Sequence, residues 1–318
     1  MLARLTIFQP DRPSRQILLQ QTRNYIIGRD DSCSIYIDDD RLSRQHAKLE
    51  HMADSWRLSD LSSKNGTLID GRAISECSLC DTQWIEFGAV LARYDCVSPE
   101  SIEADRLLFA ERLSTSIEMS RDLQPSMRSD ELLRRVLESF VELSESGRGF
   151  IMLKEAAGEF RASVSHPAVG ADFGGSRSVV TKSFAENRSV VCSDVRRDPL
   201  LSAQASIVGG GISALASLPL RVGAQVIGVI YVDSCQPGKH FSELDIEILQ
   251  ALADHAALVI GVARLREDIV DLSSMLPAEL DPARRPVKAL VDELQRYLPQ
   301  LERGTLPEKP AVAAGEPG

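Results

Sequence analysis

The chain has 318 residues, of which 43% are hydrophobic and 26% are charged, a balance typical of soluble globular domains. This length favours two domains with connecting segments over one large core. The formal net charge of −10 argues against nucleic acid as a partner, because a phosphate backbone repels an acidic surface.

No uninterrupted apolar run approaches the roughly 18 residues of a membrane-spanning helix. The first residues also lack the apolar segment and cleavage site of a signal peptide. We therefore expect a cytoplasmic protein that contacts no membrane and keeps its six cysteines as free thiols. Cys77 and Cys80 form one C-x-x-C without a second pair at zinc-finger spacing, so no metal and no other cofactor is predicted.

Residues 1–98 are predicted to be all-β. Short β-rich runs recur, and turn residues such as Gly28, Gly66 and Gly88 separate them. The predicted strands are Arg4–Phe8, Ile17–Leu19, Tyr25–Ile27, Ile35–Ile37, Ala47–Glu50, Trp56–Ser59, Thr67–Ile69, Trp84–Phe87 and Val90–Tyr94. Many short strands with frequent turns indicate a sandwich or a barrel.

A linker helix is predicted over residues 99–122. Pro99 marks a break, and apolar residues then recur near helical spacing, at Ile102, Phe109, Leu113 and Ile117.

Residues 123–262 alternate between helical and strand patterns, which predicts an α/β (α+β) domain. A helix begins at Ser129, interpreted as its N-cap, and a second helix is expected over residues 179–187. Strands are expected at 150–153, 160–164 and 190–192, followed by a hairpin of 214–220 and 226–232. The run Val226–Val232 is almost wholly apolar, which is typical of a central strand buried on both faces.

A long helix is predicted over residues 242–272, capped by Ser242. Its apolar line is open to two interpretations, a weak coiled-coil seam or an intramolecular packing face, and consists of Leu249, Leu252, Ala256, Val259 and Ala263. Residues 284–301 form another amphipathic segment, and the final residues are rich in Pro, Gly and Ala. Residues 263–318 are thus expected to be a helical and then disordered tail.

Three polar motifs stand at turns between predicted strands: Gly28-Arg29, Ser43-Arg44-Gln45-His46 and Lys64-Asn65-Gly66-Thr67. Loops at one end of a rigid β scaffold are a common binding surface. Arginine offers a planar fork for phosphate oxygens, serine adds a hydroxyl donor, and asparagine can pair with an extended peptide backbone. The three motifs together therefore predict an anion site within an acidic protein.

These motifs lie in the text YIIGRDDSCSIYIDDDRLSRQHAKLE and LSDLSSKNGTLIDGRAI, which resembles the forkhead-associated (FHA) domain family over about the first 98 residues. The family binds phosphothreonine peptides. The resemblance implies contacts to the phosphate from Arg29 and Ser43, and contacts to the phosphate or the peptide main chain from Arg44, Lys64 and Asn65. It also implies that the loops are held by Gly28, Gly66 and, through a buried hydrogen bond, His46.

One position departs from the family pattern. The common Gly-Asp before the penultimate strand reads Thr82-Gln83 here, in a turn expected to lie away from the binding loops.

The later text ELLRRVLESFVELSESGRGFIML, SFAENRSVVCSDVRRDP and ISALASLPLRVGAQVIGVIYVDS resembles the GAF domain family over about residues 123–262. That resemblance implies a central antiparallel sheet and a role in small-molecule sensing or dimerisation, with ligand-binding residues unknown. The family's cyclic-nucleotide pattern is matched loosely by Asn187-Arg188 and by Phe241–Asp245, with Ile246 in place of its final Glu. The second match is equally typical of a helix cap with an apolar staple.

No catalytic signature is found: the sequence has no H-E-x-x-H, no G-x-S-x-G and no P-loop, so no enzyme is expected. The primary hypothesis is a signalling adapter that binds a phosphothreonine-containing protein, such as a Ser/Thr kinase or its substrate. The alternative is a GAF-based sensor, with cyclic nucleotide as a candidate ligand, that regulates transcription or a kinase pathway. A third hypothesis is a homodimer paired through the helices at 99–122 and 242–272.

Overall fold

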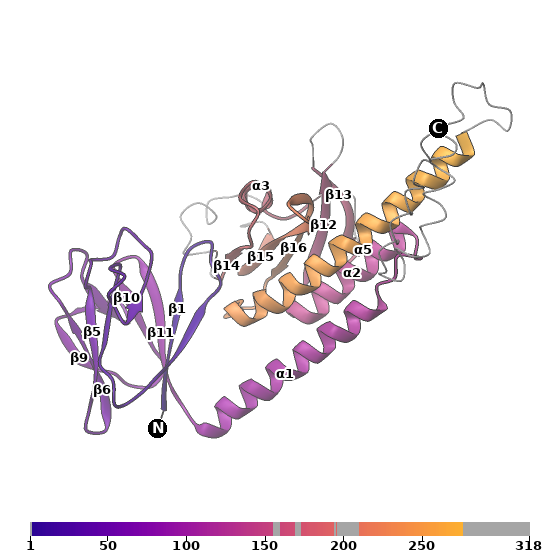
Figure 1. The fold of residues 1–318 in the computed structure, drawn as a ribbon. Coiled ribbons are helices and arrows are strands. Elements are labelled where there is room, and N and C mark those ends of the chain that lie inside the picture. The colour runs from indigo at the N-terminus through magenta and orange to yellow at the C-terminus, as the bar shows by residue number, and fades with distance from the viewer. Residues whose placement is uncertain (1, 155–159, 169–172, 194, 196–209, 276–318) are drawn as a thin grey trace, which may run out of the picture.

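The computed structural model describes residues 2–154, 160–168, 173–193, 195 and 210–275. The amphipathic segment at 284–301 and the rest of the predicted tail beyond residue 275 lie outside these residues, while residues 263–275 continue the predicted long helix. Figure 1 shows a β-rich N-terminal domain, one long connecting helix and a C-terminal domain with helices on both faces of a sheet.

The N-terminal domain is a sandwich of two sheets. Its strands are β1 (Leu2–Phe8), β2 (Arg15–Leu19), β3 (Tyr25–Gly28), β4 (Ile35–Tyr36), β5 (Ala47–Met52), β6 (Ser55–Asp60), β7 (Thr67–Ile69), β8 (Arg72–Ile74), β9 (Glu76–Ser78), β10 (Gln83–Phe87) and β11 (Val90–Val97). One sheet has the order β2-β1-β11-β10-β7-β8 and the other β4-β3-β5-β6-β9. All pairs are antiparallel except β3 with β4. The predicted sandwich is confirmed.

Alternating side chains from both sheets fill the space between them. Leu5, Ile27, Leu49 and Phe87 are fully buried there. Strands β8 and β9 were not predicted, because each has three residues that are mostly exposed and show no apolar alternation. Cys77 lies in β9.

The linker helix and the C-terminal domain follow. Their elements are α1 (Pro99–Asp122), α2 (Ser129–Ser144), β12 (Arg148–Lys154), β13 (Phe160–His166), α3 (Arg177–Glu186), β14 (Val190–Cys192), β15 (Ala214–Val222), β16 (Gln225–Ser234) and α5 (Glu243–Met275). The antiparallel sheet has the order β13-β12-β16-β15-β14. Strand β16 occupies its middle, so the prediction that the apolar run Val226–Val232 is a central strand is confirmed.

Helix α5 packs on one face of this sheet, beside α2. All five apolar residues of its predicted seam are buried in that core, namely Leu249, Leu252, Ala256, Val259 and Ala263. The intramolecular interpretation is therefore the correct one. By length and composition α5 could cross a membrane over Glu243–Val270, yet more than half of its most apolar stretch is buried inside the domain.

The start of α5 is held by a capping box. The Asp245 N–H donates to Ser242 Oγ at 3.2 Å, and the Ser242 N–H donates to the Asp245 carboxylate at 2.9 Å. The predicted cap at Ser242 is confirmed. The predicted cap at Ser129 is wrong: Arg128 is the N-cap of α2, and Ser129 donates through its N–H and its hydroxyl to Glu267 of α5. The carboxylate of Glu267, on another helix, thus accepts the N–H bond that a local N-cap side chain was expected to accept.

The two domains touch directly as well as through α1. Ser14, at the end of the β1–β2 turn, donates its N–H to the Phe241 carbonyl at 2.8 Å and accepts from the Glu243 N–H at 3.0 Å. Ser14 is 1% exposed, so these bonds are shielded from water. The sandwich is therefore attached to the segment that leads into α5.

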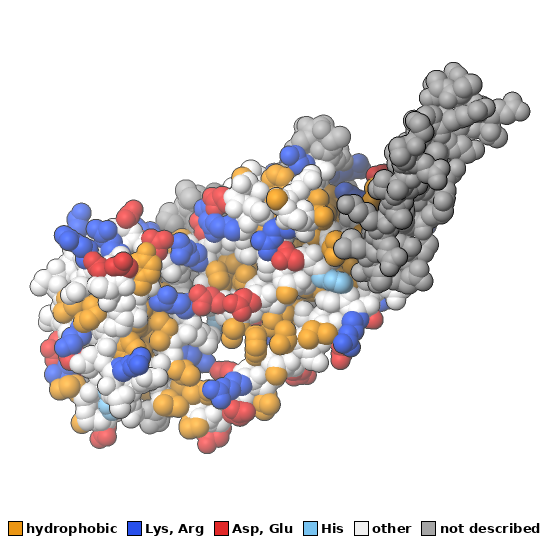
Figure 2. Space-filling view, viewed as in Figure 1, with side chains coloured by type: hydrophobic (Ala, Val, Ile, Leu, Met, Phe, Trp, Pro, Cys, Tyr) orange, Lys and Arg blue, Asp and Glu red, His pale blue; other side chains and the backbone are white. Residues whose placement is uncertain are grey.

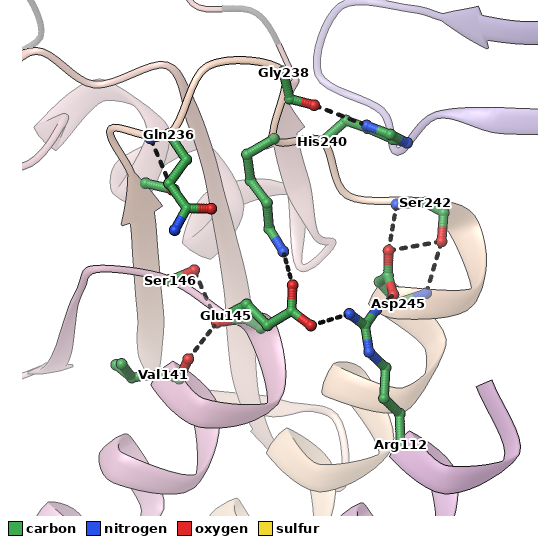
Figure 3. Close-up of polar contacts among 12 residues, drawn as sticks. Arg112, Val141, Glu145, Ser146, Gln236, Gly238, His240, Ser242 and Asp245 are labelled. Carbon is green, nitrogen blue, oxygen red and sulfur yellow. Dashed lines mark hydrogen bonds and ion pairs between the residues drawn. The ribbon is translucent and has the colours of Figure 1, made fainter. Parts of the chain in front are cut away.

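Helix α1 adds a second connection, made of ion pairs. Arg4 of β1 contacts Asp105 of α1 at 2.6 Å. Further along α1, Arg112 contacts both Glu145 and Asp245, which belong to the C-terminal domain (Figure 3). A cleft of about 390 Å³ lies between these contacts.

Two bidentate Arg–Asp pairs in the C-terminal domain allow a direct test of burial. Arg148 contacts Asp233 through two bonds of 2.9 Å, and the Asp233 side chain is fully buried. Arg221 contacts Asp254 with the same two distances, but Asp254 is 45% exposed. Burial raises the pKa of Asp233, and the Arg148 guanidinium opposes that effect.

We predict that Arg148→Ala lowers the free energy of unfolding by about 3 kcal/mol, because it leaves a buried carboxylate without its partner. Arg221→Ala should cost about 1 kcal/mol or less, since water can solvate the partner. Urea titrations followed by circular dichroism measure both values. Equal losses in the two variants would contradict the argument.

Candidate functional site: the loop end of the sandwich

The three sequence motifs meet at one end of the N-terminal sandwich. Arg29, just after β3, donates its N–H to the Ser43 carbonyl at 3.1 Å. The Lys64 N–H, in the loop between β6 and β7, donates to Ser43 Oγ at 2.9 Å. Ser43 therefore touches both other loops. We call the set Arg29, Ser43, Arg44, Lys64 and Asn65 the loop rim.

Gly28 is required by the closeness of two backbones. A Cβ at this position would lie 2.1 Å from the Arg44 carbonyl oxygen, which no side chain could tolerate. The absence of a side chain lets β3 approach the loop before β5, so that the Asp30 N–H reaches the same carbonyl at 3.1 Å. Gly66 has φ +75°, a left-handed conformation that suits glycine.

His46 bridges two of the loops from inside. Its side chain is fully buried, with Nδ1 3.3 Å from the Ser43 N–H and Nε2 3.1 Å from the Gly66 carbonyl. Because an N–H faces Nδ1, that nitrogen must accept, and the ring proton sits on Nε2 and donates to Gly66. Burial lowers the pKa of His46, so the neutral ring is the stable form. The role predicted for His46, a buried hydrogen bond between loops, agrees with this geometry.

The cationic side chains of the rim point into solvent. Arg29, Arg44 and Lys64 are all exposed, and none has an ion-pair partner within 4.0 Å among the described residues. The nearby Asp30 carboxylate accepts two bonds from Ser32, at 3.1 and 2.6 Å. These bonds lower the pKa of Asp30, with a smaller contribution from Arg44. The rim thus keeps its positive charge available for an anion.

Asn65 is fixed by a residue that the sequence reasoning did not single out. Its amide nitrogen donates to the Arg41 carbonyl at 2.7 Å. Arg41 is itself held by a bidentate contact to Asp39, at 2.9 and 2.6 Å. An asparagine amide has a second hydrogen and a carbonyl oxygen, and these can serve a peptide main chain.

Asp60, at the end of β6, orders the loop that carries Lys64 and Asn65. Its carboxylate accepts from the Ser63 hydroxyl at 2.6 Å, the Ser63 N–H at 3.0 Å and the Thr67 hydroxyl at 2.7 Å. Burial raises the pKa of Asp60, but these bonds hold it below its ordinary value. Sequence reasoning missed this residue, although its three-residue spacing to Ser63 matches the side-chain-to-backbone bond of an N-cap.

The turn at Thr82-Gln83 lies at the opposite end of β10 from the rim. Strand β10 begins at Gln83 and runs to Phe87, and the following Gly88 lies beside Asn65. Thr82 adopts φ +59°, a left-handed backbone conformation that is strained for a β-branched residue but not for glycine. The departure from the family pattern is thus a local backbone cost remote from the loops.

In the C-terminal domain, the sheet face opposite α5 is packed with side chains. Phe150, Phe173 and Tyr231 form two edge-to-face ring pairs with centroids 5.0 and 5.2 Å apart. A Cβ at Gly175 would lie 2.6 Å from the Tyr231 ring. The described part of this face, covered by α3, is therefore an apolar core.

The residues that matched the cyclic-nucleotide pattern have structural roles. Asn187 is the left-handed C-cap of α3 at φ 49°. Phe241 is 1% exposed in the core, and Ser242 and Asp245 form the capping box of α5. The interpretation as a helix cap with an apolar staple accounts for these contacts.

Comparison with known proteins agrees with the two resemblances. The family model for the FHA domain matches residues 25–88, and the model for the GAF domain matches residues 126–261. Comparison with curated proteins found no match.

Among solved structures, the FHA domain of the CT664 protein from Chlamydia trachomatis is 29% identical with a TM-score of 0.30, covering 31% of this chain and 100% of its own. The Slr1951 protein from Synechocystis sp. is 31% identical with a TM-score of 0.28, covering 30% of this chain and 99% of its own. A GAF domain/HD domain protein from Geobacter sulfurreducens is 18% identical with a TM-score of 0.37, covering 43% of this chain and 94% of its own.

The sandwich with its loop rim and the five-stranded α/β domain thus define a multidomain signalling protein. The chain combines an N-terminal FHA domain with a C-terminal GAF domain.

His46 predicts a pH dependence of stability. Its folded-state pKa lies below the ordinary value of about 6.5, so the unfolded chain binds more protons as the pH falls through that value. Stability contributed by the neutral ring is therefore full above pH ~6.5 and is lost on acidification toward the lowered folded-state pKa.

Both tryptophans, Trp56 and Trp84, lie in the FHA domain, and Trp56 is buried in its core, so their fluorescence follows the unfolding of this domain. We expect the wild-type urea midpoint to fall between pH 7 and pH 5.5. His46→Gln should be less stable at pH 7 yet lose less over that interval. Parallel losses in the two proteins would show that another group is responsible.

Proposed function

We propose that this protein is a signalling adapter whose FHA domain binds phosphothreonine peptides at the loop rim. The observation that carries the proposal is the convergence of Arg29, Ser43 and the Lys64–Asn65 loop, locked together from inside by His46. The match to the FHA family supports it.

The rim has the chemistry that a dianionic phosphate needs. Ser43 Oγ accepts from the Lys64 N–H, which leaves its own hydrogen to donate to a phosphate oxygen. Arg29 supplies a planar fork, and Arg44 and Lys64 supply further charge. Charge-assisted bonds contribute about 1.5–3 kcal/mol each, so several suffice for micromolar affinity after the ordering cost.

The partner in this proposal is a phosphothreonine-containing protein, with a Ser/Thr kinase or its substrate as the leading candidates. We further propose that the protein works in the cytoplasm and has no catalytic centre of its own. Its role is then to bring the phosphorylated partner to the GAF domain.

A GAF-based sensor is the alternative function. In the described part of the face under α3 the rings of Phe150, Phe173 and Tyr231 pack against one another, so a ligand such as a cyclic nucleotide would have to bind beside these rings.

Homodimerisation is a second proposal, supported by an apolar line on the outside of α5. Leu258 is 55% exposed and Leu265 is 46% exposed, and Val262 lies between them at coiled-coil spacing. Helix α1 also exposes apolar residues, and Figure 2 shows hydrophobic side chains over the part of the surface formed by α1 and α5. This line differs from the buried seam that the sequence suggested.

We predict that Arg29→Ala weakens binding to phosphothreonine peptides at least about 100-fold, since it removes a charge-assisted, bidentate contact. Isothermal titration with a peptide selected from a phosphothreonine library measures the change. Arg23→Ala, an exposed arginine before β3 at the other end of that strand, is the matched control and should bind as wild type. Unchanged affinity of Arg29→Ala would refute the adapter proposal.

For the dimer, we predict that Leu258→Glu with Leu265→Glu raises the dissociation constant at least about tenfold, because it puts charges into an apolar seam. Light scattering over a concentration series provides the measurement. Leu18→Glu, at a residue of similar exposure in β2, should leave the mass unchanged. A wild-type protein that remains monomeric at all concentrations would exclude the dimer.

A further inference from the structure

The turn between β1 and β2 contacts the GAF domain and also the part of the FHA domain that lies next to the loop rim. We call residues 9–14 the hairpin tip. On the GAF side, the Asp11 carboxylate contacts Lys182 Nζ of α3 at 2.5 Å. The Asp11 carbonyl accepts from Arg188 Nη1, just after α3, at 3.1 Å. Both cations therefore bind the same residue of the tip.

On the FHA side, the hairpin tip contacts the segment that follows β4. Arg12 pairs with the Asp38 carboxylate at 2.9 Å, and Gln9 donates to the Asp38 carbonyl at 3.4 Å. Arg15, the first residue of β2, donates to the Tyr36 carbonyl at 3.0 Å. The hairpin tip, which contacts α3, therefore also contacts the segment 36–38.

The segment 36–38 is in turn one bond away from the rim. The Ile37 N–H donates to the Gly28 carbonyl at 2.9 Å, directly before Arg29. Two residues further on, Asp39 holds Arg41, whose carbonyl holds the Asn65 amide. A continuous set of contacts therefore runs from α3 through the hairpin tip to both ends of the rim.

Attachment of the two domains does not depend on Lys182 and Arg188 alone. Ser14 holds the segment before α5, and Arg4 and Arg112 tie α1 to each domain. The contacts to Asp11 are thus additional to what keeps the domains together, and they come from α3 and from Arg188 just after it.

We propose that Lys182 and Arg188 of the GAF domain are positioning residues for the phosphopeptide rim and act through the hairpin tip. This inference rests on the proposed phosphothreonine binding. It makes the GAF domain a contributor to peptide affinity, because any shift of α3 is transmitted to residues 36–44.

The test uses the full chain and one phosphothreonine peptide that the wild type binds. Lys182→Ala with Arg188→Ala should weaken that peptide about fivefold, the lower range of ordinary coupling between sites. Amide hydrogen exchange of residues 36–44, without peptide, should become faster. Lys182→Arg should retain wild-type affinity. Glu186→Ala, which removes the exposed partner of Arg188 but leaves Asp11 untouched, should also bind as wild type.

A double-mutant cycle separates positioning from general loosening. If the cations act through the tip, Asp11→Asn and Lys182→Ala together should weaken the peptide no more than the stronger single change. Additive losses, or unchanged affinity and exchange in the Lys182–Arg188 double variant, would overturn the proposal. Should the wild type bind no phosphothreonine peptide, the proposed function fails, and unchanged exchange at 36–44 would then reject the coupling separately.

Discussion

The loop rim of the FHA domain depends on the buried imidazole of His46. A neutral ring accepts from Ser43 and donates to Gly66, so one side chain sets the distance between two loops. No exposed contact could do this as well, because water would compete for both nitrogens. The loops that carry the exposed cations of the rim are therefore held in place by a buried group that lies outside the rim.

Around the rim, buried and half-buried residues order the loops while exposed residues carry the charge. Asp60 orders the Lys64–Asn65 loop from below, and Gly28 lets two backbones approach where a side chain would collide. Arg29, Arg44 and Lys64 keep their charges in solvent. Preorganised loops reduce the ordering cost of binding, which is why the proposed phosphopeptide site needs only a few charge-assisted bonds.

The two domains are connected at more than the linker. The hairpin tip meets α3 and the segment before α5, while α1 carries ion pairs to both domains. In the GAF domain, the sheet face packed by α5 forms the main hydrophobic core, and the face packed by α3 forms a second core rich in aromatic rings. In the coupling proposed above, the domain junction is the route by which the GAF domain affects the FHA rim.

The sequence by itself determined nine of the eleven sandwich strands and the chemistry of the rim. Period-two alternation, turn glycines and the three motifs identify the sandwich strands, and the apolar run of β16 identifies a central strand, because these signals lie within a few residues of each other. Only the tertiary structure decided which face of α5 is buried. It also decided that Glu267 accepts the hydrogen bonds of Ser129 at the start of α2. Likewise, only the fold shows that the hairpin tip connects α3, through Asp11, to residues 36–38. Those outcomes join residues far apart in the chain, and no local pattern specifies which distant group will satisfy a given donor, charge or apolar face.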